Sequence, residues 1–153
     1  MQLGRRGLGG PAAEAQAAEH THLHGDRLAI FENKSDRPHW VHLPKLALDL
    51  LADHAGHLFE QRSPTAIQSR LKRAGTGWTP HDLRRTFATK LSGLKVDGLN
   101  VAPPHVVEKM LNHSLGGVMA IYNRHGYEAE RVAAAEAWAV EVERIVKVAK
   151  SDV

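Results

Sequence analysis

The apolar positions of the chain first appear in two short runs and then at helical spacing. The two early runs, residues 28–32 and 38–43, have the composition of strands. Between them, Asn33-Lys34-Ser35-Asp36 has the composition of a hairpin turn. The sequence therefore predicts one small β-hairpin near the start of the ordered part of the chain.

After the hairpin, apolar residues recur every three or four positions, which indicates helices. The helices are expected around residues 46–51, 66–71, 80–91, 104–111 and 128–150, with a short segment at 118–122. Gly75 and Gly77 end the second helix, and Pro103 and Pro104 start the fourth. The last helix carries an apolar stripe that we assign to the core: Val132, Ala135, Trp138, Val142 and Ile145.

The third helix has the clearest start. Thr79 is a good N-cap, Pro80 fits the first helical position, and Asp82 favours the positive end of the helix. The expected buried positions are Leu83, Phe87 and Leu91, and the expected opposite face carries His81, Arg84 and Ala88. This helix therefore presents a histidine and an arginine one turn apart.

The pattern as a whole predicts a mainly α fold with a small β-hairpin, of the α+β class. Residues 1–26 contain helix-breaking glycines and Pro11, so we expect an irregular or truncated N-terminal segment. Residues 27–153 are expected to form one domain, since the chain of 153 residues is too short for two comfortable ones.

Composition narrows the class of protein. Hydrophobic residues make up 42% and charged residues 24% of the chain, which is typical of a soluble globular protein. The chain has no cysteine, no apolar run long enough to span a membrane and no signal peptide, so we expect a cytoplasmic protein. A net charge of +3 permits a polyanionic partner without demonstrating one.

The residue types in three nearby segments suggest phosphodiester chemistry. His81-Asp82-Leu83-Arg84-Arg85-Thr86 is followed by Leu111-Asn112-His113 and then by Tyr122. A guanidinium matches two non-bridging phosphate oxygens, and a tyrosine can attack phosphorus if its developing anion is stabilised. No cluster of carboxylates that would hold Mg²⁺ adjoins the His/Arg run, which favours a route without a metal or cofactor.

These segments resemble the boxes of the tyrosine recombinases, the phage integrase family, and most closely the prophage integrases of the P4-like kind. Residues 79–89 resemble the His-x-x-Arg box, residues 111–113 the Leu-Gly-His box, and residues 118–124 the segment with the nucleophile. The resemblance covers roughly residues 28 to 145. It implies a tyrosine recombinase catalytic domain from a mobile element.

The resemblance also implies a role for each matching residue. Tyr122 would attack the DNA strand, and Arg84 would clamp the scissile phosphate. His81 would contact that phosphate or assist proton transfer, and His113 would donate a further hydrogen bond to it. Lys34 would protonate the leaving 5′-oxygen. The family's first arginine would be Arg5, although Leu8 stands where the family has a glutamate. The basic residues expected to contact duplex DNA are Arg85, Arg70, Lys72 and Arg73. A homotetramer on paired DNA sites is the expected assembly.

Other interpretations remain open at this point. A catalytically impaired DNA-binding remnant would keep the same boxes, and a departure at Arg5 would favour it. Tyr127 is a rival nucleophile, and each basic cluster taken alone is typical of a solvated helix face. His20, His22 and His24 alternate, so on a strand they would share one side, as a small zinc-binding module would require.

Overall fold

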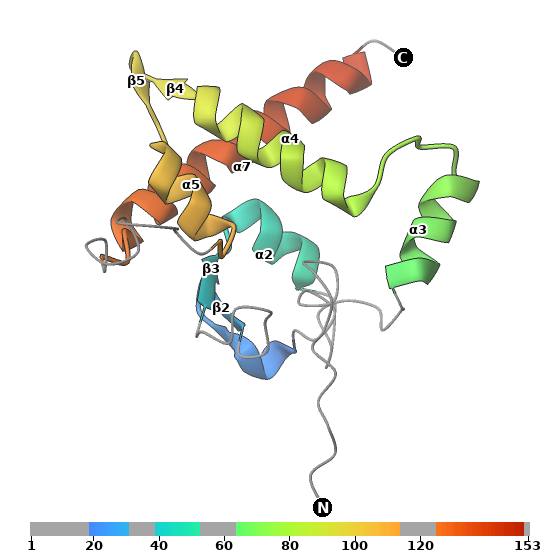
Figure 1. Cartoon of the computed structure of the whole chain (residues 1–153), viewed down its shortest axis with the longest axis horizontal. Helices are drawn as coiled ribbons and strands as arrows, with labels where there is room; N and C mark the ends of the chain where they lie inside the picture. The colour runs from blue at the N-terminus through green and yellow to red at the C-terminus, as the bar shows by residue number, and fades with distance from the viewer. Residues whose placement is uncertain (1–18, 31–38, 53–63, 114–124, 152–153) are drawn as a thin grey trace, which may run out of the picture.

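Helices dominate the architecture, and a small sheet lies beside them (Figure 1). The computed structural model describes residues 19–30, 39–52, 64–113 and 125–151. In chain order these residues form η1 (His20–His22), β1 (Leu23–His24), β2 (Arg27–Ile30), β3 (His39–His42), α2 (Lys45–Leu51), α3 (Pro64–Arg73), α4 (Pro80–Gly93), β4 (Lys95–Val96), β5 (Leu99–Asn100), α5 (Pro104–Met110) and α7 (Glu128–Ser151). The predicted α+β class is confirmed.

The sheet contains the predicted hairpin strands and one more. β2 and β3 pair antiparallel, with Leu28 opposite Val41 and Ala29 opposite Trp40. β1 pairs with the outer edge of β2, and together with η1 it lies inside the segment that we expected to be irregular. That expectation was wrong for residues 20–24, because β1 and β2 form a tight hairpin across Gly25-Asp26, a turn signal that the sequence analysis did not use. The turn expected at residues 33–36 lies outside the described residues.

The start of α4 agrees with its prediction. The Thr79 hydroxyl accepts a hydrogen bond from the Asp82 backbone N–H, and the Asp82 carboxylate accepts one from the Thr79 backbone N–H at 2.9 Å. The Thr79 hydroxyl also donates to the Asp82 carboxylate at 2.7 Å, and this bond, followed by the one from the Thr79 backbone N–H, holds the pKa of the Asp82 carboxyl below its usual range. The capping box therefore fixes where the helix begins, and with it the position of His81 and Arg84.

The predicted inward face of α4 was partly wrong. Leu91 is fully buried and Phe87 packs against the core, but Leu83 is 55% exposed. Residues spaced four apart drift by about 40° per step around a helix with 3.6 residues per turn. Because α4 meets its neighbours through Leu91, the face that turns inward near its start carries Arg84, and Ala88 also packs against the core.

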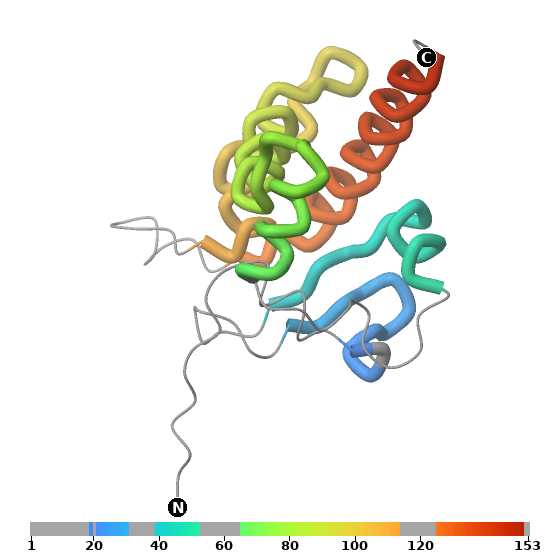
Figure 2. The backbone as a smooth tube through the Cα atoms, turned by 90° about the vertical axis from the view of Figure 1, so that its right-hand side faces the viewer, coloured from blue at the N-terminus to red at the C-terminus, as the bar shows by residue number. Residues whose placement is uncertain are grey.

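The main core lies where α4, α5 and α7 meet. Its buried members are Leu91, Ala102, Val106, Val107, Leu111 and Ala134. At its edge the rings of Phe87 and Trp138 meet at right angles, with centroids 5.4 Å apart, which confirms the core role expected for Trp138. A second, smaller cluster joins Leu28 of β2 to Leu51 of α2. Figure 2 shows the three helices on one side and the sheet with α2 below them.

Polar contacts attach α7 to the sheet. The guanidinium of Arg131 lies 3.9 Å from the centre of the Trp40 ring and donates a hydrogen bond to the Trp40 carbonyl. One turn later, Glu136 contacts Nε2 of the buried His42 at 2.6 Å. These contacts fix the first half of α7, whereas Ile145, expected in the core, is 42% exposed because the second half extends beyond its neighbours (Figure 1).

The short hairpin between α4 and α5 was not predicted. Lys95 and Val96 pair with Asn100 and Leu99 across Asp97 and Gly98, which both have positive φ. Asp-Gly is a strong signal for a two-residue hairpin turn, and it was present in the sequence.

No helix within the described ranges is long and apolar enough to cross a membrane.

Candidate functional site

A hydrogen bond joins the predicted box on α4 to the predicted box that follows α5. Arg84, partly buried on α4, donates from its guanidinium to the carbonyl oxygen of Leu111, which caps the C-terminal end of α5. Leu111 is buried in the core and is itself the first residue of the second box. The bond therefore connects the first box to the residue two positions before His113, and it uses one of the five N–H donors of the arginine.

The second box ends α5 in a defined geometry. Asn112 has φ +54°, its N–H donates to the Lys109 carbonyl at 3.1 Å, and the N–H of His113 donates to the Glu108 carbonyl at 2.9 Å. This pair of bonds is the Schellman motif, in which the residue after the helix adopts a left-handed conformation. Glycine or asparagine suits that position, so Asn112 serves where the related box has glycine.

His113 extends from this turn at the surface, and its ring has a partner that the sequence analysis missed. Nδ1 of His113 lies 2.7 Å from a carboxylate oxygen of Glu108, and both side chains are partly exposed, at 47% and 44%. The separation of five residues between Glu108 and His113 is the one that a Schellman turn brings together. The sequence therefore contained a signal for this contact, which is a glutamate five residues before the histidine.

His39 is a second neighbour of the site that the sequence analysis did not single out. It lies on β3, partly buried, and its ring donates a hydrogen bond to the Met110 carbonyl. Burial lowers the pKa of His39 to about 4, and the positive charges of Arg131 and Arg84 act in the same direction, while the hydrogen bond to Met110 opposes them. His39 is therefore neutral at neutral pH and connects the sheet to the same helix end that Arg84 reaches.

This pKa predicts acid sensitivity of the fold. In the unfolded chain His39 takes up a proton near its ordinary pKa of about 6.5, whereas the folded protein resists this until about pH 4. The contribution of His39 is therefore complete above about pH 6.5 and is lost as the pH falls toward 4, by about 1 to 3 kcal/mol. Urea unfolding at pH 7 and at pH 4.5 measures this loss.

The comparison uses His39→Phe, which keeps a ring but cannot titrate. We expect this variant to lose less stability between the two pH values than the wild type does. His24→Phe, on the exposed face of β1, is the matched control and should follow the wild type. An identical pH dependence in wild type and His39→Phe would contradict the assignment.

Of the remaining predicted catalytic residues, one is described. His81 is exposed in the first turn of α4, one turn before Arg84. Tyr122, Lys34 and Arg5 lie outside the described residues. The structure thus brings Arg84 next to the His113 box and gives no geometry for the nucleophile, the general acid or the first arginine.

The rival tyrosine has a packing role. The Tyr127 ring lies 4.6 Å from the ring of His105 and 4.8 Å from that of His125, measured between centroids, and packs against the core. The Tyr127 carbonyl accepts the backbone N–H of Arg131 at 2.9 Å in the first turn of α7. These contacts give Tyr127 a packing role at the start of α7.

The four basic residues expected to contact DNA are all exposed and lie on two successive helices. Arg70, Lys72 and Arg73 occupy the last turn of α3, and Arg85 follows His81 in the first turns of α4. Arg85 lies 3.7 Å from Asp82, with 73% of its side chain exposed. Cations at the end of α3 also suit the negative end of its dipole.

The histidine tract does not form the strand that a zinc module would require. His20 and His22 belong to the 3-10 turn η1 and His24 to β1, so the three do not alternate along one strand. Among the described residues, no group of three or more potential metal ligands lies together. The alternating spacing therefore does not place the three histidines along one strand, because the chain turns within the tract.

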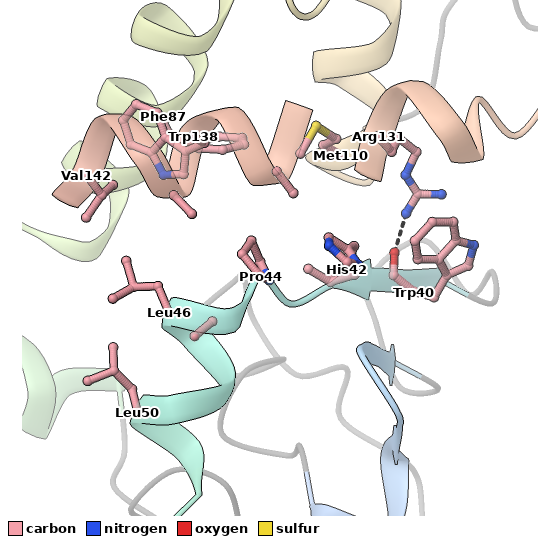
Figure 3. A pocket seen from close by; sticks show the side chains of 14 residues that line it. Trp40, His42, Pro44, Leu46, Leu50, Phe87, Met110, Arg131, Trp138 and Val142 are labelled. Carbon is pink, nitrogen blue, oxygen red and sulfur yellow. Dashed lines mark hydrogen bonds between the residues drawn. The ribbon is translucent and has the colours of Figure 1, made fainter. Parts of the chain in front are cut away.

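An apolar cavity of about 300 Å³ lies between α2, β3 and α7 (Figure 3). Its walls include Leu46, Leu50, Trp138 and Val142, and neither Arg84 nor His113 lines it. Among the described residues that line it, the one lysine or arginine is Arg131, which is already engaged with Trp40. A phosphodiester needs charged partners when it leaves water, so this cavity is not the phosphate site.

Comparison with protein families supports the same assignment as the boxes. A family model described as the phage integrase family matches residues 13–129, which is most of the chain and includes both boxes and Tyr122. No curated protein and no solved structure matches the chain. On the extent of the family match, the chain belongs to the phage integrase family, the tyrosine recombinases.

Proposed function

We propose that this chain is a site-specific DNA recombinase that cuts and rejoins DNA strands through a 3′-phosphotyrosyl intermediate. The observation that carries the proposal is the hydrogen bond from Arg84 to the Leu111 carbonyl, which joins the two boxes of a chain in the phage integrase family. This bond holds a guanidinium beside the helix end that presents His113. Two phosphate-binding side chains thus come from one rigid junction.

The proposed reaction is an in-line exchange of one ester for another. The Tyr122 oxygen forms a bond to the scissile phosphorus, and the bond from phosphorus to the 5′-oxygen breaks. The phenol proton leaves with the assistance of His81, and Lys34 gives a proton to the departing 5′-oxygen. Arg84, His113 and Arg5 stabilise the negative charge on the non-bridging oxygens. The second transesterification reverses these steps with a 5′-hydroxyl of the partner strand.

The energy of the broken bond is retained in the phosphotyrosyl ester, so the proposed reaction uses no cofactor. Arg85, Arg70, Lys72 and Arg73 would contact phosphates of the duplex, which gives affinity that falls with salt. The proposed catalytic domain comprises residues 27–153, with β1 as an added edge strand, and acts as a homotetramer on paired sites. A P4-like prophage element recombines inside its host cell, which places the reaction in the cytoplasm.

Covalent trapping on nicked duplexes tests this proposal. The nick lets the 5′-terminated fragment diffuse away, so attack by a tyrosine leaves a protein–DNA complex that survives denaturation. We expect such a complex with duplexes from the flanking DNA of the element, and peptide mapping should locate the modified tyrosine at Tyr122. If no duplex yields a complex while salt-sensitive binding persists, the chain is the impaired DNA-binding remnant, and the departure beside Arg5 would be the first place to look for the cause.

A further inference from the structure

Glu108 holds His113 through both its main chain and its side chain. The Glu108 carbonyl accepts the His113 N–H at 2.9 Å, and the Glu108 carboxylate lies 2.7 Å from Nδ1 of the ring. The left-handed Asn112 turns the chain back so that the ring comes over the last turn of α5. An exposed histidine three residues beyond the end of a helix has many rotamers, and this double attachment selects among them.

The chemistry of the two partners fixes which ring nitrogen is available. An ionised carboxylate only accepts hydrogen bonds, so the contact with Glu108 requires a hydrogen on Nδ1 of His113. A phosphodiester oxygen also only accepts. His113 can therefore serve both partners only in its protonated form, with Nδ1 donating to Glu108 and Nε2 donating to the phosphate.

We propose that Glu108 is a positioning residue of the recombination site, which anchors His113 by Nδ1 and so directs Nε2 toward the scissile phosphate. This inference rests on the proposed function. Glu108 touches neither the DNA nor the nucleophile in this role and acts through His113 alone. Partners that orient a functional histidine through its second nitrogen affect activity by factors of about 10 to 100 in metal sites, and a similar range is expected here.

The first test separates this role from simple electrostatics. Glu108→Ala removes a negative charge close to bound DNA, so charge alone would leave binding and cleavage unchanged or improved. Our proposal instead predicts that Glu108→Ala binds DNA as tightly as the wild type or more tightly, but cleaves it more slowly, on the order of tenfold. The cleavage rate is measured as the single-turnover rate of covalent complex formation at saturating protein. The matched control is Glu143→Ala, whose carboxylate is partly exposed on α7, and this variant should cleave like the wild type.

A double-mutant comparison tests whether Glu108 acts through His113. In a His113→Ala background, adding Glu108→Ala should cause no further loss of rate. A full further loss, or a Glu108→Ala variant that cleaves as fast as Glu143→Ala, would overturn the proposal. Alanine suits the helical position 108, and thermal unfolding checks that the variant folds.

A measurement on protein that cannot react with DNA distinguishes failure of the role of Glu108 from failure of the proposed recombinase function. Long-range ¹H–¹⁵N spectra of the histidine rings report which nitrogen carries hydrogen, and they can be recorded on Tyr122→Phe, with and without a duplex. We expect His113 to be protonated at Nδ1 in the free protein and at both nitrogens with DNA bound. A ring with bare Nδ1 would overturn the role of Glu108, whatever the trapping experiment shows. A protein that never forms a covalent complex, with Nδ1 protonated, would instead remove the proposed function and with it this role.

Discussion

Tyr122→Phe is expected to abolish the covalent protein–DNA complex completely. The proposed ester bond forms at the phenolic oxygen of Tyr122, and phenylalanine has no atom that can replace it. DNA binding should stay within about twofold of wild type, because phosphate contacts of the basic residues supply most of the affinity. Denaturing gels of trapping reactions on nicked duplexes, beside binding assays on the same duplexes, measure both quantities.

Tyr127→Phe is the matched control for this experiment. The ring of Tyr127 contacts the rings of His105 and His125 and packs against the core, and phenylalanine preserves that packing. The control should therefore form the covalent complex at nearly the wild-type rate. A complex that persists in Tyr122→Phe, or one that disappears in Tyr127→Phe, would show that the nucleophile has been assigned to the wrong tyrosine.

Arg84→Lys is expected to slow strand cleavage by a factor of about 10² to 10³. Arg84 already donates one hydrogen bond to the Leu111 carbonyl, and the proposed role requires further donors directed at the phosphate from the same planar group. A lysine ammonium is a compact charge without that fork, so it cannot keep both contacts in the same geometry. Single-turnover cleavage at saturating protein isolates this effect from any change in affinity.

The charge is kept in Arg84→Lys, so DNA affinity should change much less than the cleavage rate. Lys45→Ala is a suitable control, because its side chain is 85% exposed on α2 and pairs with Asp49 of the same helix. It should cleave like the wild type. If Arg84→Lys retained cleavage within a few fold of wild type, Arg84 would be a structural link between α4 and α5 and not a phosphate ligand.

Local interactions explain why much of the helical structure was predictable. Thr79 and Asp82 form their capping box within one turn, and Pro104 starts α5 at a position where its missing N–H costs nothing. The turn at Asn112 that follows α5 also depends on hydrogen bonds between residues at most five apart. The order of the boxes is likewise a property of the sequence, and it was sufficient to indicate the family that the family model then matched.

The predictions that failed are of two kinds: some depended on how the elements pack together, and others overlooked a local turn signal. Leu83 was expected inside and is exposed, because the inward face of α4 depends on where α5 and α7 cross it. β1 pairs with β2 across Gly25-Asp26, and β4 with β5 across Asp97-Gly98, so both hairpins were missed although their turns are local signals.

What the sequence alone determined, then, is most of the helices, the starts of α4 and α5, the two strands β2 and β3, and the boxes that indicate the family. Only the tertiary structure decided which of them meet. Arg84 reaches the carbonyl of Leu111, and His39 reaches that of Met110, across long stretches of chain. Such pairs form because burying α4, α5 and the sheet together leaves the carbonyls at the end of α5 in need of donors, and the packing of the helices determines which side chains can supply them.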